Sequence, residues 1–252
     1  MGPLHRAPSP RSAPASRPYS GPVPVTVACL VPAAPLLLPR LTGSRVPEAE
    51  AVRAAVTAVL GALTGLDRLL VVAPSVPGTL AGFGAPEVPG APGAPRFPAP
   101  LGSWPHALAQ ALLDDVAGSP ADRTWLTWDD VDQVAGSAGS VGSAGSVASA
   151  GPAAGDRTGL LLLADGSRTR GPRAPGGDDP RGEGVDAELV AALRAGRPPV
   201  VPDADAVGAT AGPAVRLLVE LTAGRPGAVD VLHADAPLGV FYLVALARLA
   251  GT

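Results

Sequence analysis

Asp165, Ser167 and Arg168 follow an apolar run at residues 160–164. A run of this kind predicts a buried strand that ends in a polar loop at the rim of a sheet. Ligands of open α/β sheets bind at that rim, where the carboxyl ends of the strands lie. The guanidinium of Arg168 suits an anionic or polar small molecule, because it donates several hydrogen bonds in a fixed fork. A solvated loop is the alternative interpretation.

His233 and Asp235 form a second candidate pair near the C-terminus. Positions two apart on a strand face the same side of a sheet, so the imidazole and the carboxylate can meet. A histidine held by a carboxylate is typical of a general base or a metal ligand. A surface pair at a strand end is the alternative, and the residues alone leave both open.

The pattern of apolar residues predicts how these side chains are positioned. Short apolar runs predict strands at residues 25–30, 68–73 and 159–164, and helical spacing predicts helices that include residues 47–63 and 182–195. Strand, helix and strand in that order form a unit with parallel strands, whose carboxyl ends lie together. We therefore expect one cleft at this edge. The residues expected to line it are Ala33, Ser75, Asp165 and Ser167, with His233 and Asp235 approaching from a strand pair at 229–233 and 240–244.

Composition restricts the fold class and the partners. The 252 residues, of which 46% are hydrophobic and 3% aromatic, suit layers of sheet and helix. Together with the strand–helix–strand order, this composition predicts a single α/β domain, a three-layer sandwich with a mostly parallel central sheet. The domain is expected at residues 23–252, after a disordered tail at 1–22 and with a low-complexity insertion at 135–155. A net charge of −3 argues against nucleic-acid binding, and no run is long enough to span a membrane. With one cysteine, Cys29, a cytoplasmic protein is expected.

Three segments together resemble the class III extradiol ring-cleavage dioxygenases, in their subunit-B-like branch. The segments are residues 31–39 (VPAAPLLLP), residues 164–167 (ADGS) through 179–181 (DPR), and residues 236–244 (APLGVFYLV). The resemblance runs from about residue 25 to the C-terminus. It implies an α/β sandwich in which two histidines and a carboxylate hold Fe(II), leaving open positions for a catecholate and O₂.

The chain departs from this family at the metal ligands. The resemblance places Ala33 where the family has one histidine, and residues 73–75 (APS) where it has the other. Asp235 is the carboxylate that remains, and a relocated triad of His106, His233 and Asp235 is one alternative. Two functions therefore stay open. The first is an oxidoreductase that opens an aromatic diol ring with Fe(II). The second is a non-catalytic descendant of that fold, for which no cofactor is expected and which binds a small molecule or a partner subunit.

Overall fold

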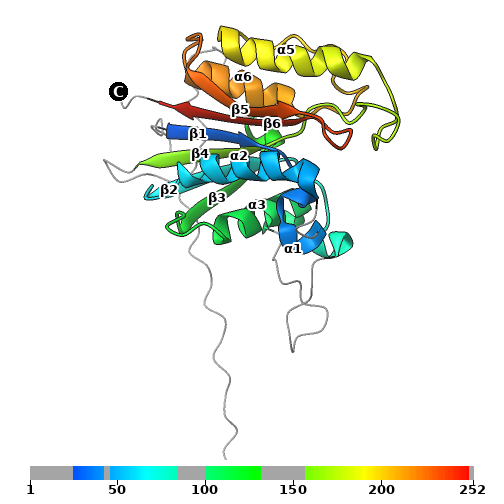
Figure 1. The fold of residues 1–252 in the computed structure, drawn as a ribbon. Coiled ribbons are helices and arrows are strands. Elements are labelled where there is room, and N and C mark those ends of the chain that lie inside the picture. The colour runs from blue at the N-terminus through cyan, green and yellow to red at the C-terminus, as the bar shows by residue number, and fades with distance from the viewer. Residues whose placement is uncertain (1–24, 43–45, 85–99, 132–156, 250–252) are drawn as a thin grey trace, which may run out of the picture.

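The computed structural model describes residues 25–42, 46–84, 100–131 and 157–249, which contain one sheet of six strands in the order β3-β2-β4-β1-β6-β5 (Figure 1). The strands are β1 Val25–Val31, β2 Arg68–Ala73, β3 Asp122–Thr127, β4 Thr158–Leu163, β5 Val229–Asp235 and β6 Tyr242–Arg248. The predicted tail at 1–22 and insertion at 135–155 lie outside the described residues.

Strand direction decides which residues share an edge of the sheet. β1, β2, β3 and β4 are parallel, as predicted for β1, β2 and β4, whereas β6 is antiparallel to both β1 and β5. β5 therefore runs in the same direction as the four parallel strands. Its carboxyl end and the first residue of β6 both lie at the edge where β1 to β4 end. The prediction of a mostly parallel sheet in an α/β fold is confirmed, with one strand, β6, running antiparallel to both of its neighbours.

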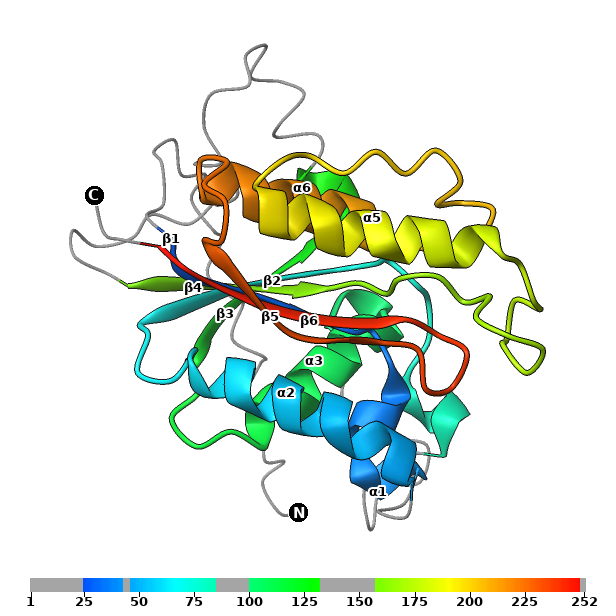
Figure 2. The same ribbon diagram turned by 45° about the horizontal axis from the view of Figure 1, so that its top comes forward.

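Helices cover both faces of the sheet (Figure 2). On one face lie α1 Pro39–Thr42, α2 Glu50–Gly61 and α3 Trp104–Asp114, and on the other lie α5 Arg181–Ala195 and α6 Ala211–Leu221. Short 3-10 helices are η1 Pro35–Leu37, η2 Pro47–Ala49, η3 Leu80–Phe83 and η4 Pro100–Gly102. Within the described residues, no helix has the length and apolar character needed to cross a membrane.

Side chains of the central strands alternate between two hydrophobic cores. In β4, Leu161 and Leu163 pack with α2 and α3, whereas Leu160 and Leu162 pack with α5 and α6. Every residue of β4 is buried, and its last four residues are leucines, as expected for a strand that is covered on both faces. We call the two sides the α2 face and the α5 face. This alternation fixes which face each residue at the end of a strand points toward.

A β-bulge changes the facing of β5 (Val229–Asp235) near its carboxyl end. Val231 pairs with Ala245, which lies in the core of the α5 face, but His233 pairs with Val244, which lies in the core of the α2 face. The extra residue of a bulge shifts the register by one and turns the following side chains over. His233 and Asp235 consequently lie on the α2 face, as their pairing with Val244 and Tyr242 requires.

Candidate functional site

The backbone of Asp165 is held in place by the start of α6. Its N–H donates to Thr210 Oγ1 at 3.0 Å, and its carbonyl accepts from the N–H groups of Thr210 and Ala211 at 2.8 and 2.9 Å. Asp165 follows β4, and it continues the parity of Leu161 and Leu163 on the α2 face. The start of helix α6 thus fixes the backbone of Asp165 just beyond the end of β4.

The Asp165 carboxyl group is half-buried, and the described residues give it few hydrogen-bond partners. Oδ1 accepts one hydrogen bond, from the N–H of Ala33 at 3.0 Å, which ties the end of β4 to the segment after β1. Burial raises the pKa of Asp165 to about 6, although the Ala33 N–H and the charge of Arg168 act in the opposite direction. Arg168 itself is exposed and packs beside Gly208. A carboxylate with this pKa accepts hydrogen bonds at neutral pH and can exchange a proton slightly below it.

Tyr242 is a residue of this site that sequence reasoning did not single out, although it lies within the segment that carries the family resemblance. It begins β6, is buried, and pairs directly with Asp235 of β5. Burial raises the pKa of its hydroxyl, and the negative charge of Asp165 raises it further. Tyr242 lies in the core of the α2 face, two strand neighbours or about 10 Å from β4, and its phenol stays neutral and able to donate.

His233 and Asp235 extend the same face toward the edge of the sheet. The Nε2 atom of His233 is buried without a hydrogen-bond partner in the described residues, and burial lowers the pKa of the imidazole, against the charge of Asp235. Asp235 is exposed and accepts from the N–H of Ala236 at 2.8 Å. Three neighbour steps separate β4 from β5, so Asp235 and Asp165 share an edge about 14 Å apart.

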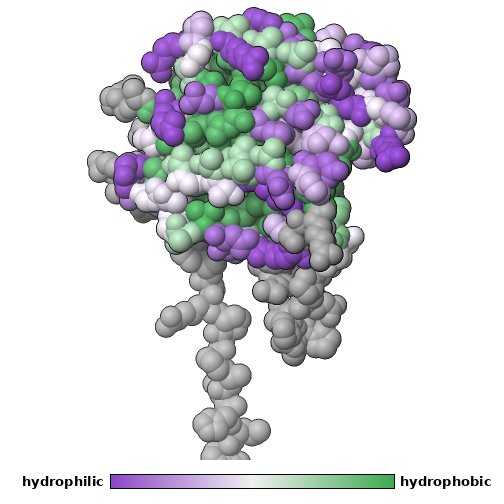
Figure 3. Space-filling view, in the orientation of Figure 1, coloured by the Kyte–Doolittle hydropathy of each residue, from purple (hydrophilic) through white to green (hydrophobic). Residues whose placement is uncertain are grey.

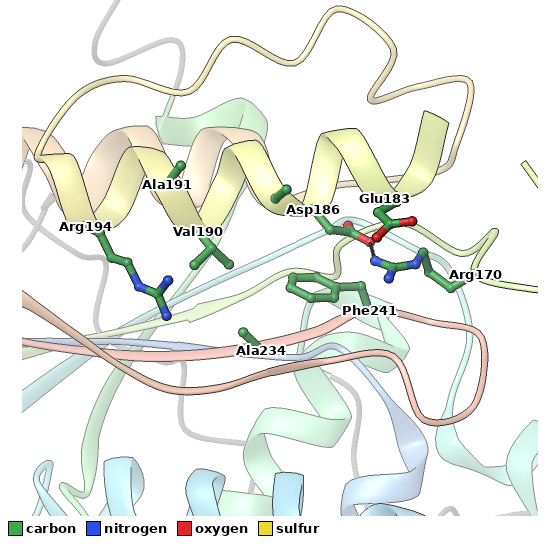
Figure 4. Close-up of a pocket in the computed structure, with 9 residues that line it drawn as sticks. Arg170, Glu183, Asp186, Val190, Ala191, Arg194, Ala234 and Phe241 are labelled. Carbon is green, nitrogen blue, oxygen red and sulfur yellow. Dashed lines mark hydrogen bonds and ion pairs between the residues drawn. The ribbon is translucent and has the colours of Figure 1, made fainter. Parts of the chain in front are cut away.

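Ser167 has a different environment from the one expected for a residue lining the cleft. It is fully buried, its N–H donates to Asp186 Oδ1 at 2.8 Å, and its hydroxyl donates to Asp186 Oδ2 at 2.6 Å. Arg170 adds a third hydrogen bond to Asp186 at 2.9 Å (Figure 4). Asp186 lies on α5 and is 1% exposed. Ser167 therefore joins the loop after β4 to α5, on the face opposite Asp165.

Asp186 was also missed by the sequence analysis, although a signal for it exists. It stands three and seven residues before Leu189 and Leu193, which are both in the core of the α5 face. A carboxylate on the apolar stripe of a helix needs buried partners, since an isolated buried charge is strongly unfavourable. Ser167 and Arg170 supply those partners.

The two positions at which the resemblance calls for a histidine ligand have no imidazole in this chain. Ala33 is buried and contributes its backbone N–H, and Ser75 is exposed after β2. The relocated triad is not assembled. His106 Nε2 bonds to the carbonyl of Leu126 in β3 at 2.9 Å, whereas His233 lies on β5, five neighbour steps or about 24 Å away. Within the described ranges, no group of three His, Cys, Asp or Glu residues is placed to hold a metal ion.

The site thus consists of Asp165 and Tyr242, the Ala33 N–H between them in the sheet order, and His233 with Asp235 toward the edge. It offers a hydrogen-bond acceptor, a phenol donor and a neutral imidazole on one face. A comparison of the chain with protein-family models found no matching family, and a comparison with curated proteins found no match.

Proposed function

We propose that this chain is a small-molecule-binding α/β domain, a non-catalytic descendant of the extradiol dioxygenase fold that it resembles in sequence. The observation that carries the proposal is the half-buried Asp165 carboxyl group, which accepts one hydrogen bond from the described residues and lies on the same face of the sheet as Tyr242. A buried polar group is normally fully hydrogen-bonded, so one with spare acceptor sites at a strand end favours a ligand.

The residues present do not fit Fe(II). A facial triad needs two imidazoles and a carboxylate around one point. Alanine and serine stand at the two positions where the resemblance calls for histidine, and the two histidines of the described residues lie near opposite edges of the sheet, beside β3 and on β5. We therefore derive no ring-cleavage step. The proposed role is binding.

The chemistry of the site favours a small ligand with hydroxyl groups. At neutral pH the Asp165 carboxylate accepts hydrogen bonds from such groups, and the Tyr242 phenol remains protonated. A neutral diol or phenol gains both contacts, whereas an anionic ligand is repelled by Asp165 unless Arg168 reaches it. Helices on both faces of the sheet support the three-layer sandwich that the resemblance implies. The buried free thiol of Cys29 suits the reducing cytoplasm.

Catechol is the probe that tests this proposal, because it carries two neighbouring hydroxyl groups. We expect it to shift the NMR signals of residues around Asp165 with a dissociation constant near the millimolar range, as its few heavy atoms allow. Asp165→Asn and Tyr242→Phe should each weaken binding about fivefold or more, since each removes one charge-assisted or hydroxyl contact. Asp205→Asn, at an exposed carboxylate, is the matched control. Equal affinity in all four proteins would contradict the site.

Iron loading tests the proposal that this chain does not bind Fe(II). After anaerobic incubation with Fe(II) and desalting, the protein should retain well under one iron per chain, because no described cluster supplies three ligands. Near-unit occupancy that disappears in a His233→Ala variant would restore the enzyme hypothesis.

A further inference from the structure

A groove runs between α5 (Arg181–Ala195) and β5 (Val229–Asp235), on the face of the sheet opposite Asp165. Its volume is about 350 Å³, and its apolar lining includes Ala187, Val190, Ala234 and Phe241. Figure 4 shows Val190 and Arg194 extending from α5 toward the strand, and Figure 3 shows hydrophobic surface between the helices and the edge of the sheet.

Charges of opposite sign lie at the two ends of this groove. Glu183 stands at the N-terminal end of α5 and Arg194 at the C-terminal end, eleven residues or about 16 Å apart. Neither side chain forms an ion pair with another described residue, whereas Arg170 beside Glu183 is paired with Asp186. The apolar stretch between them includes Ala187 and Val190, and small side chains there allow another helix to approach closely.

We propose that a second copy of this chain docks on the groove, with α5 packed antiparallel against α5 of the partner around a two-fold axis. The axis would pass between residues 188 and 189. In this arrangement Glu183 of each copy faces Arg194 of the other copy, and Ala187 of each copy faces Val190 of the other. This self-complementarity is what a two-fold interface requires, because each side must present the same patch. An unrelated acidic or basic partner would satisfy only one of the two charges.

Features of the edge strand β5 favour a partner that packs against a helix over one that adds a strand to the sheet. β5 has β6 as its neighbour within the described residues, but its bulge between Val231 and His233 breaks the regular ladder of backbone groups. Asp230 and Asp235 also place carboxylates along that edge, and both residues are exposed. Bulges and charges of this kind are how edge strands avoid pairing with another strand. The partner is therefore expected to contact α5 and the groove rather than to extend the sheet.

We expect a dimer of micromolar affinity, because one helix and one groove per copy offer fewer contacts than the roughly 20–30 residues per partner of a standard stable interface. Sedimentation velocity of the full chain, from about 1 to about 300 µM, should show a monomer–dimer equilibrium in this range. A chain that stays monomeric throughout overturns the proposal.

Charge exchange tests the register. Glu183→Arg and Arg194→Glu should each weaken the dimer about tenfold or more, because each brings like charges together twice, and the double variant should return to within about threefold of the original. The matched controls are Glu220→Arg and Arg216→Glu, which make the same changes at exposed positions of α6. A dimer that responds equally to the variants and the controls forms through another face, and that result also overturns the proposal.

Discussion

Asp165 and Asp186 flank the end of β4 on opposite faces of the sheet, and they differ in how fully they are hydrogen-bonded. Asp186 accepts from the Ser167 N–H, the Ser167 hydroxyl and Arg170, and it is almost completely buried. Asp165 accepts from the Ala33 N–H, and burial raises its pKa to about 6. A carboxylate whose oxygens are satisfied by the protein stabilises the fold. One whose oxygens are not is available to a ligand.

The contrast reflects where the partners come from. The partners of Asp186 lie on the loop after β4, which is itself joined to the turn before β6 by Phe241 N–H to Ser167 O at 2.8 Å. That loop is therefore part of the core on the α5 face. On the α2 face the neighbouring groups are Tyr242 and a backbone N–H, and neither neutralises the charge of Asp165.

The largest expected effect is that of Asp186→Ala. It leaves the buried hydroxyl and N–H of Ser167 without an acceptor and Arg170 without its ion-pair partner. We expect a loss of about 3 kcal/mol in the free energy of unfolding. Removing one partner of a buried ion pair is strongly unfavourable, because the other partner loses its compensating charge. Urea-induced unfolding at pH 7 measures it. Asp165→Ala should cost less than about 1 kcal/mol. Similar losses for the two variants would contradict the difference proposed between the two carboxylates.

Gly166, between the two carboxylate environments, should give the next largest effect. A Cβ there would lie 2.8 Å from Asp186 Oδ1 and still closer to Phe241 Cδ1. We expect Gly166→Ala to destabilise by about 2 kcal/mol, because the packed loop must shift. Gly61→Ala is the control, since a Cβ at this position in α2 meets nothing within 4 Å. That variant should stabilise by up to about 1 kcal/mol, as expected for alanine in a helix. Melting temperatures that do not differ between the two variants would show that the loop adapts freely.

The sequence predicts the elements of this fold well because burial on both faces leaves a clear pattern. The runs at 25–30, 68–73 and 159–164 became β1, β2 and β4 with shifts of one residue, and the helix predicted at 182–195 became α5. The strand predicted at 240–244 is part of β6, which continues to Arg248. Its antiparallel direction depends on contacts with β1 and β5, which no local pattern contains.

The candidate site was predictable only in part, for reasons of side-chain direction. Asp165 continues the alternation of side chains along β4, and it therefore lies on the same face as Leu161 and Leu163. Ser167, two residues later, should share that face, but regular alternation ends at Gly166 and the hydroxyl turns to Asp186 on α5. His233 and Asp235 share a face as expected, yet a bulge decides which face it is. The charge of Asp165 acts on Tyr242 from two strand neighbours away, and only the order of the strands in the sheet shows that the two residues share this region.

The smallest and sharpest test of the contrast is the pH dependence of stability around Asp165. The pKa of its carboxyl group rises from 3.8 to about 6 on folding. Between these values the folded state binds more protons than the unfolded state, so the contribution of Asp165 to stability falls as pH rises from about 4 to about 6 and is constant above that. Asp165→Asn has no such titration, so its stability relative to the original chain should increase over the same window.

A pKa change of this size corresponds to at most about 3 kcal/mol, and we expect about 1–2 kcal/mol because the half-buried carboxylate keeps part of its hydration. Urea unfolding of both proteins at pH 4, 5, 6 and 7.5 measures the difference, with Asp205→Asn as the control for removal of an exposed carboxylate. A difference that stays level across the window would mean that Asp165 is as well satisfied as Asp186. The carboxylate would then have no spare capacity for a ligand, because its hydrogen-bond acceptors would already be occupied in the folded protein.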